Sequence, residues 1–311
     1  MQPFPRARDS ILLLFNPLLE PERQDISHNH YLPVMSSFVK AHGMLFRQGS
    51  ITNFIAYGDE FLSLLDNHIG RVEAKYREQG VCIGSANIAG MFEYGNSNGI
   101  LMKLYTESLT LSPEARLQAA QEYWANPPTD VEHSLQYSYI GGDKNVLPHV
   151  HLSLAFIWSL ALVPASMVYV QGEIPWGQLV VFLNTVYRHG VDESRVENEQ
   201  FPIPESGTAH HLPEDFFIRG QVWAQLCYPA DFFDDLSVND EERSLELPSV
   251  AVPRTERCLW YGYRLASLDR WITFNKQDRQ FRVKPFATEL EKSAQVFGRR
   301  QRPVVERVDA E

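Results

Sequence analysis

The sequence predicts an all-α fold, built from stacked antiparallel helical hairpins in a solenoid-like array. Three observations support this fold class: apolar residues recur at helical spacing, helix-start signals precede several of these segments, and strand-like alternation is nearly absent before residue 190. Hydrophobic residues make up 44% of the 311 residues, which is enough for a sizeable core.

The clearest apolar stripe predicts a long helix near the N-terminus. Its members are spaced by three, four and seven positions: Phe54, Phe61, Leu65, Ile69, Val72 and Tyr76. A shorter helix over residues 34–45 precedes it, and Gly49 and Ser50 separate the two. Helices joined by such a short turn form an antiparallel hairpin.

Further helices are expected along the rest of the chain, over residues 81–94, 113–124, 148–162, 176–188 and 253–268, with a short one after Pro213. Small residues in the first of these, including Gly84, would let a neighbouring helix approach closely. The second begins with a capping serine, Ser112, followed by Pro113 and by an acid in the first turn.

Four other segments have a different character. Residues 190–212 are expected to be a long polar loop, and the aromatic stretch 222–233 is expected to lie in the core. A small β-hairpin is possible near residues 271–283. Residues 286–311 are predicted to form a charged, disordered tail.

The charge of the chain is unevenly distributed. The net charge is −11, which argues against indiscriminate binding to polyanions. Residues 190–248 carry 14 acidic and 3 basic side chains, whereas residues 249–311 carry 8 acidic and 13 basic ones. The last fifth of the chain is therefore basic.

The cysteines and the apolar segments exclude two classes of protein. Cys82, Cys227 and Cys258 form no CxxC pair, which excludes a disulfide framework and a thiolate zinc site and fits a reducing compartment. The most apolar stretch, 147–170, contains histidines and prolines. It therefore predicts a buried helix and not a membrane span.

Several stretches resemble one family. They are FVKAHGMLFR (38–47), DNHIGRVEAKYREQGVCIGSANIAGMFEYG (66–95), LPHVHLSLAFIWSL (147–160), IPWGQLVVFLNTV (174–186), LPEDFFIRGQVWAQLCYPADFF (212–233), ERCLWYGYRLA (256–266) and WITF (271–274). Together they resemble the DNA/RNA-binding domain of the ever-shorter-telomeres and SMG adaptor family, in its fungal form. The resemblance covers roughly residues 5–285, and its motifs are structural.

The resemblance implies a domain organisation and a function. Residues 1–20 look like a remnant of the phosphopeptide-binding helical-repeat domain that precedes this region in the family, and residues 21–285 correspond to the DNA/RNA-binding-type domain. The implied role is a non-catalytic adaptor in nonsense-mediated mRNA decay and/or telomere maintenance, in the nucleus and/or cytoplasm. Implied partners are RNA or single-stranded DNA and components of the decay or telomerase ribonucleoprotein.

The helix over 253–268 carries the main candidate nucleic-acid site. Its candidate side chains are spaced by three, four and three positions and share one face: Arg254, Arg257, Tyr261 and Arg264. Guanidinium groups bind phosphates and a ring stacks on bases. The alternative is that these arginines pair with the acidic segment 231–246 or face water. In the tail, Arg299, Arg300 and Arg302 are further candidates for phosphate contacts, or simply part of a disordered end.

Other sites are weaker. Trp176 begins a helix near a break, so it is a candidate for partner binding, although a core position is the alternative. No metal site is expected, because no histidine pair has i,i+4 spacing and the acidic residues 231–242 form one contiguous run. Nucleophile and nucleotide-binding motifs are absent from the sequence. We therefore predict no enzyme and no cofactor, with a pure protein–protein scaffold as the alternative function. The sequence does not predict the oligomeric state.

Overall fold

The computed structural model describes residues 76–126, 147–168, 170–172, 174–187, 191–203, 211–229, 231–233 and 251–301. The N-terminal hairpin expected over residues 34–76 lies almost wholly outside this part of the chain. Within it, eleven α-helices and one small antiparallel sheet make up the regular structure, together with a short 3-10 turn. The expected helical character and the hairpin near 271–283 are confirmed.

The elements follow one another as α4 (Tyr76–Met91), η3 (Glu93–Gly95), α5 (Ile100–Ser108), α6 (Pro113–Ala125), α7 (Leu147–Ala161), α8 (Pro164–Met167), α9 (Trp176–Val186), α10 (Glu193–Glu197), α11 (Pro213–Ile218), α12 (Ala224–Cys227), α14 (Ala251–Ser267), β1 (Ile272–Asn275), β2 (Gln280–Val283) and α15 (Pro285–Gln301). The sequence predicts helices that begin at Pro113, at Trp176 and at Pro213, and the structure confirms these three starting positions. At the first of these, the Ser112 hydroxyl oxygen accepts a hydrogen bond from the Ala115 N–H.

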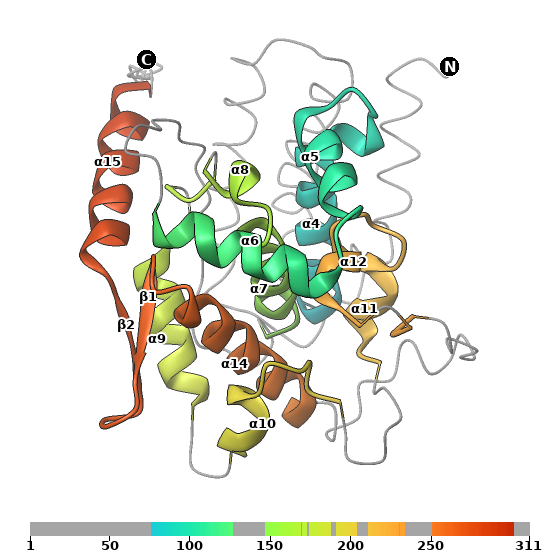
Figure 1. The fold of residues 1–311 in the computed structure, drawn as a ribbon. Helices are drawn as coiled ribbons and strands as arrows, with labels where there is room; N and C mark the ends of the chain where they lie inside the picture. Colours follow the sequence, from blue (N-terminus) through green and yellow to red (C-terminus); the bar gives the residue numbers. More distant parts are fainter. Residues whose placement is uncertain are drawn as a thin grey trace, which may run out of the picture.

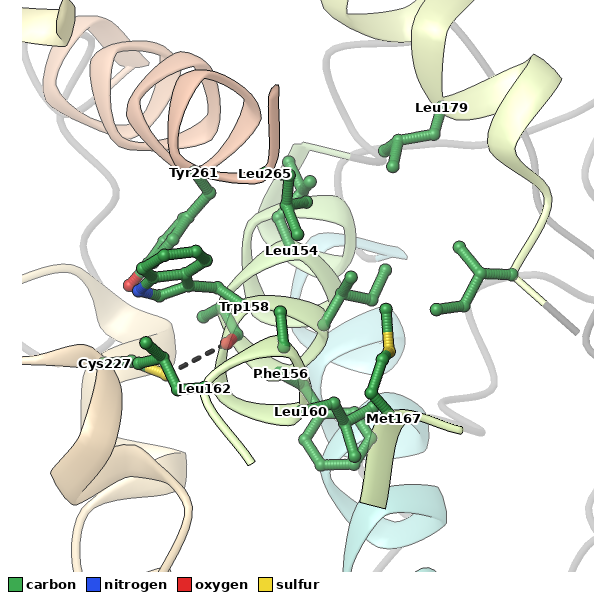
Figure 2. Close-up of a cluster of buried hydrophobic side chains, with 14 of the residues drawn as sticks. Leu154, Phe156, Trp158, Leu160, Leu162, Met167, Leu179, Cys227, Tyr261 and Leu265 are labelled. Carbon is green, nitrogen blue, oxygen red and sulfur yellow. Dashed lines mark hydrogen bonds between the residues drawn. The ribbon is translucent and has the colours of Figure 1, made fainter. Parts of the chain in front are cut away.

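Helix α7 lies at the centre of the core. It packs against α4, α12 and α14 (Figure 1), and twelve of its side chains are buried, on every face of the helix. Figure 2 shows apolar side chains such as Leu154, Phe156 and Leu160 spreading from this helix toward its neighbours. A helix that is apolar on all sides is stable only when other elements surround it, which explains the mostly apolar composition of this stretch. In the described part of the chain, no helix is long and apolar enough to cross a membrane.

Small residues allow α4 to approach α7 closely, as the sequence predicts. A Cβ atom added at Gly84 would lie 2.7 Å from Leu152 Cδ2 and 3.2 Å from the His149 ring. Real side-chain atoms do not approach so closely, so a larger residue at this position would push the two helices apart.

The β-hairpin packs against the helices on both sides. Phe281 of β2 donates its N–H to Asn184 Oδ1 at 2.8 Å, and its carbonyl accepts from Asn184 Nδ2 at 3.0 Å. The Asn184 side chain, on α9, therefore satisfies backbone groups of β2 as a neighbouring strand would. On the other side β1 packs against α14.

Three tryptophans from separate elements join α6, α9 and the start of the hairpin. The rings of Trp176 and Trp271 are stacked, with centroids 5.3 Å apart, and Trp124 meets Trp271 edge to face at 4.7 Å. Each indole N–H has an acceptor: the Ala161 carbonyl for Trp124, and the Gln171 carbonyl and side chain for Trp176 and Trp271. Buried indoles require such partners.

Two segments differ from the sequence-based expectation. The polar loop expected over 190–212 contains α10, which is capped by the Asp192 side chain. The disordered tail expected from residue 286 is wrong for residues 286–301, which belong to α15. Phe286 and Leu290 are half-buried on α15, and Gly177 on α9 donates its N–H to Glu291 at 2.9 Å. These contacts hold a helix in a stretch whose composition is mostly polar.

Candidate functional site

The four residues proposed for nucleic-acid binding on α14 lie inside the protein. The exposed fraction is 1% for Arg254, 2% for Arg257, 0% for Tyr261 and 8% for Arg264. Figure 2 shows Tyr261 and Leu265 pointing from α14 into the apolar layer around Leu154 and Trp158. The expected outward-facing basic stripe is therefore wrong, because both faces of α14 are covered by other elements.

The Arg254 guanidinium makes a two-point contact with a buried carboxylate. Its Nε and Nη2 donate to Glu214 Oε1 and Oε2 at 2.6 and 2.9 Å. Glu214 lies in the first turn of α11, and its Oε1 is also 2.9 Å from His151 Nδ1 on α7. Three helices therefore meet at one carboxylate, and paired hydrogen bonds fix the geometry of the arginine.

A second pair lies beside the first. Arg257 Nη1 donates to Asp215 Oδ2 at 2.7 Å. Asp215 also accepts from the Leu212 N–H at 2.8 Å and from the Tyr228 hydroxyl at 3.0 Å. The Arg257 guanidinium lies 5.1 Å from the ring centroid of Phe201 and 5.1 Å from that of Phe232, a cation–π arrangement.

We call Arg254, Arg257, Glu214, Asp215, His151 and Tyr228 the buried ionic cluster. Burial alone would raise the pKa of Glu214, but the hydrogen bond from His151 and the charge of Arg254 outweigh it and lower that pKa to about 2. Burial opposes the charge of Arg257 too, yet Asp215 raises the pKa of that arginine. Two guanidinium groups therefore face two carboxylates, and the Glu214 carboxylate stays ionised at neutral pH.

Arg264 and Trp260 form a separate contact with α10. Arg264 Nη2 donates to the Glu197 carbonyl at 2.8 Å, and the Trp260 indole donates to the Asn198 carbonyl at 2.8 Å. These carbonyls lie at the C-terminal end of α10, where backbone acceptors have no partner within the helix. The Arg264 guanidinium therefore binds the C-terminal end of α10 and not a phosphate.

The remaining sequence candidates lie elsewhere. Trp176 is 0% exposed and stacked on Trp271, so it belongs to the core, and its expected role as a partner-binding residue is wrong in this structure. Arg299 and Arg300 lie near the end of α15, and their side chains, like the whole of Arg302, are outside the described part. They are not brought together with the α14 residues by any contact within the described residues.

The buried ionic cluster has no arrangement for metal binding. Among the described residues, no group of three or more histidine, cysteine or carboxylate side chains is placed to hold a metal ion. His151 contacts Glu214, and burial lowers the pKa of the second α7 histidine, His149, to about 4. Burial also raises the pKa of Cys227 and of Cys258, which keeps both thiols protonated.

The partners of the α14 arginines were available in the sequence but were assigned elsewhere. Glu214 and Asp215 are expected in the first turn of a helix, and they occupy it. The sequence pointed to acids in the run 231–246, most of which lies outside the described residues, whereas the carboxylate contacts within the described residues come from α11. The sequence feature that could have indicated this pairing is the presence of two adjacent acids, Glu214 and Asp215, and of two arginines three positions apart on one helix face.

The cluster can hold α11 and α12 against α7 and α14, and its burial leaves it no solvent-facing side for a substrate.

Comparison with models of known protein families found no match, and comparisons with curated proteins and with solved structures found none either.

Proposed function

We propose that this chain is a non-catalytic adaptor of the ever-shorter-telomeres and SMG type, acting in nonsense-mediated mRNA decay and/or telomere maintenance in the nucleus and/or cytoplasm. The sequence resemblance and the mostly helical fold support this proposal. The observation that carries the non-catalytic part of the proposal is the buried ionic cluster, in which Arg254 and Arg257 are neutralised by Glu214 and Asp215 inside the protein. In this proposal the histidine, carboxylate and arginine side chains of the buried ionic cluster stabilise the fold.

The finer architecture in this proposal is a stack of antiparallel helical hairpins. Such arrays present long grooves between neighbouring helices, and these grooves bind other macromolecules. Protein partners would be components of the decay machinery or of the telomerase ribonucleoprotein.

Nucleic-acid contact, in this proposal, belongs to the C-terminal end of the chain. With the α14 arginines committed internally, the remaining candidates are Arg299, Arg300 and Arg302. Residues 249–311 carry an excess of basic side chains, which favours RNA or single-stranded DNA at that end.

The second candidate function is a pure protein–protein scaffold without nucleic-acid contact. Two observations favour it: the α14 candidates are buried, and the whole chain carries a net charge of −11. A strongly negative protein is repelled by a phosphate backbone unless its basic residues gather on one surface.

Affinity purification of the full chain from its native cells, with protein mass spectrometry and RNA sequencing of the eluate, tests the adaptor role. Recovery of decay factors or of telomerase components is expected, in amounts comparable to the chain itself. An eluate without either set would contradict the proposal.

Oligonucleotide binding distinguishes the two functions. A labelled single-stranded RNA is titrated with the full chain at 50 and 200 mM salt, because log K falls by about 0.7 per neutralised phosphate for each unit of log salt. The double variant Arg299→Glu/Arg300→Glu is expected to lose binding and to flatten this slope. The control Lys103→Glu/Arg219→Glu changes the net charge equally at two exposed positions outside the C-terminal region. Equal binding by both variants would favour the pure protein scaffold.

A further inference from the structure

The turn between α5 and α6 is a continuous exposed segment. Residues 110–115 are all exposed, and they include the dipeptide Ser112-Pro113. This dipeptide is the only place in the 311-residue sequence where a serine or threonine precedes a proline. An enzyme that requires this dipeptide therefore has a single target in the chain.

The backbone at Ser112 is already extended. Its φ and ψ angles are −64° and 156°, and Pro113 then occupies the first position of α6. The Ser112 hydroxyl oxygen accepts the Ala115 N–H at 3.2 Å, which leaves the hydroxyl at the surface. An exposed hydroxyl in an extended segment before proline is the substrate form that proline-directed protein kinases take.

Next to this turn lies a buried cation. Arg116 is 5% exposed, and its Nε and Nη2 donate to the carbonyls of Ser108 and Leu111 at 3.2 and 3.1 Å. Among the ion pairs of the described residues, none gives Arg116 a carboxylate partner. Its described hydrogen bonds go to backbone carbonyls, and one of these carbonyls belongs to Leu111, the residue before Ser112.

The first turn of α6 also favours negative charge. The pKa of the exposed Glu114 is lowered, first by its own backbone N–H and then by the Ser112 hydroxyl. Unpaired N–H groups and the helix dipole stabilise anions at this end of a helix.

We propose that Ser112 is a phosphorylation site for a proline-directed protein kinase, and that the phosphate caps α6 beside the Arg116 guanidinium. ATP supplies the phosphoryl group. A bond forms between Ser112 Oγ and the γ-phosphorus, the bond from that phosphorus to the bridging oxygen breaks, ADP leaves, and the hydroxyl proton passes to the kinase. The phosphate adds a charge of about −1.5 to −2 and three acceptor oxygens. This modification is independent of the adaptor function.

The experiment uses the folded full chain, ATP, Mg²⁺ and a recombinant kinase of the cyclin-dependent class, with mass spectrometry to locate the phosphate. One phosphate per chain is expected, at Ser112. The variants Ser112→Ala and Pro113→Ala are each expected to reduce labelling at least tenfold, although the second retains the hydroxyl. Absence of labelling in the parent, or undiminished labelling of Pro113→Ala, would overturn the proposed site.

Thermal unfolding tests the capping contact separately. The phosphorylated chain is expected to unfold about 2 °C above the unmodified chain in 50 mM salt. This shift is expected to shrink in 500 mM salt, because ions screen exposed charges. A phosphorylated chain whose unfolding temperature is unchanged or lower at 50 mM salt would refute the pairing of the phosphate with α6 and Arg116.

Discussion

At the scale of single residues, the fold depends on charged side chains that are buried away from solvent. Glu214 is fully buried and is held by Arg254 and His151. Desolvating a charge is costly, and the partner charge offsets this cost only while both are present. The contribution of such a pair therefore shows most clearly when one member is removed.

The substitution Glu214→Gln is expected to lower the free energy of unfolding by about 3–5 kcal/mol, because Arg254 would remain buried without its counter-charge. Urea denaturation at pH 7 measures the loss. The matched control is Glu193→Gln, which removes the carboxylate that Arg279 contacts at 3.1 Å on the surface. That control is expected to lose less than about 1 kcal/mol. Equal losses of unfolding free energy in the two variants would mean that the buried pair contributes no more to stability than a surface pair.

His149 gives the fold a pH dependence of its own. Burial lowers the pKa of His149 to about 4, from an ordinary value of 6.5. The unfolded chain therefore takes up a proton below about pH 6.5, and the folded chain resists it until about pH 4. The stability contributed by neutral His149 is complete above pH 6.5 and is lost as the pH falls toward 4.

Denaturation curves between pH 7 and pH 4 test this assignment. The parent is expected to lose about 3 kcal/mol over this range through His149, and His149→Gln is expected to show a flatter profile. The Glu214 contribution falls in a lower window, because its stabilisation is present above about pH 4.5 and is lost toward pH 2. An unchanged slope in His149→Gln would refute the role of that histidine.

At the scale of elements, close approach decides where the helices cross. A Cβ added at Gly262 on α14 would lie 2.8 and 2.9 Å from the two Cδ atoms of Leu183 on α9. The β-hairpin packs on the same two helices. This glycine therefore sets the spacing of three elements.

The substitution Gly262→Ala is expected to destabilise the fold by about 1–3 kcal/mol, because the Leu183 side chain must move within a close-packed core. Gly177→Ala is the matched control, since its added Cβ would meet Glu291 at an ordinary 3.6 Å on a helix. There the better helix propensity of alanine is expected to give a gain of up to about 1 kcal/mol. Thermal unfolding of both variants measures the contrast, and a loss in both would contradict it.

The elements also show how far sequence reasoning reached. Proline and serine signals placed the starts of α6, α9 and α11, because these signals act locally. Periodicity identified a face on α14 but not which face meets solvent, since Arg254 and Arg257 find their acids more than thirty residues away. α15 was missed because its packing against α9 comes from tertiary contacts and not from composition.

At the scale of the whole molecule, the described elements share one continuous core. Buried side chains from α4 to α15 form a single cluster in which each contacts others. All six tryptophans are buried in it: Trp124, Trp158, Trp176, Trp223, Trp260 and Trp271. Elements that share one core tend to unfold together.

We therefore expect tryptophan fluorescence and far-ultraviolet circular dichroism to report the same transition in urea. The midpoints from the two probes are expected to coincide within error. A fluorescence transition at a clearly lower urea concentration would show that the tryptophan-bearing elements unfold as a separate unit.

The spacing of acids and arginines in the buried ionic cluster has a consequence for chain register. Glu214 and Asp215 meet Arg254 and Arg257 in one alignment. Sliding α11 by one residue would bring Pro213 or Phe216 opposite an arginine and leave a charge stranded in hydrocarbon. Alignments of α11 that are shifted by one residue are therefore disfavoured, because each would leave a buried charge without a partner. A newly synthesised chain can pack this segment without such a cost only in the observed alignment.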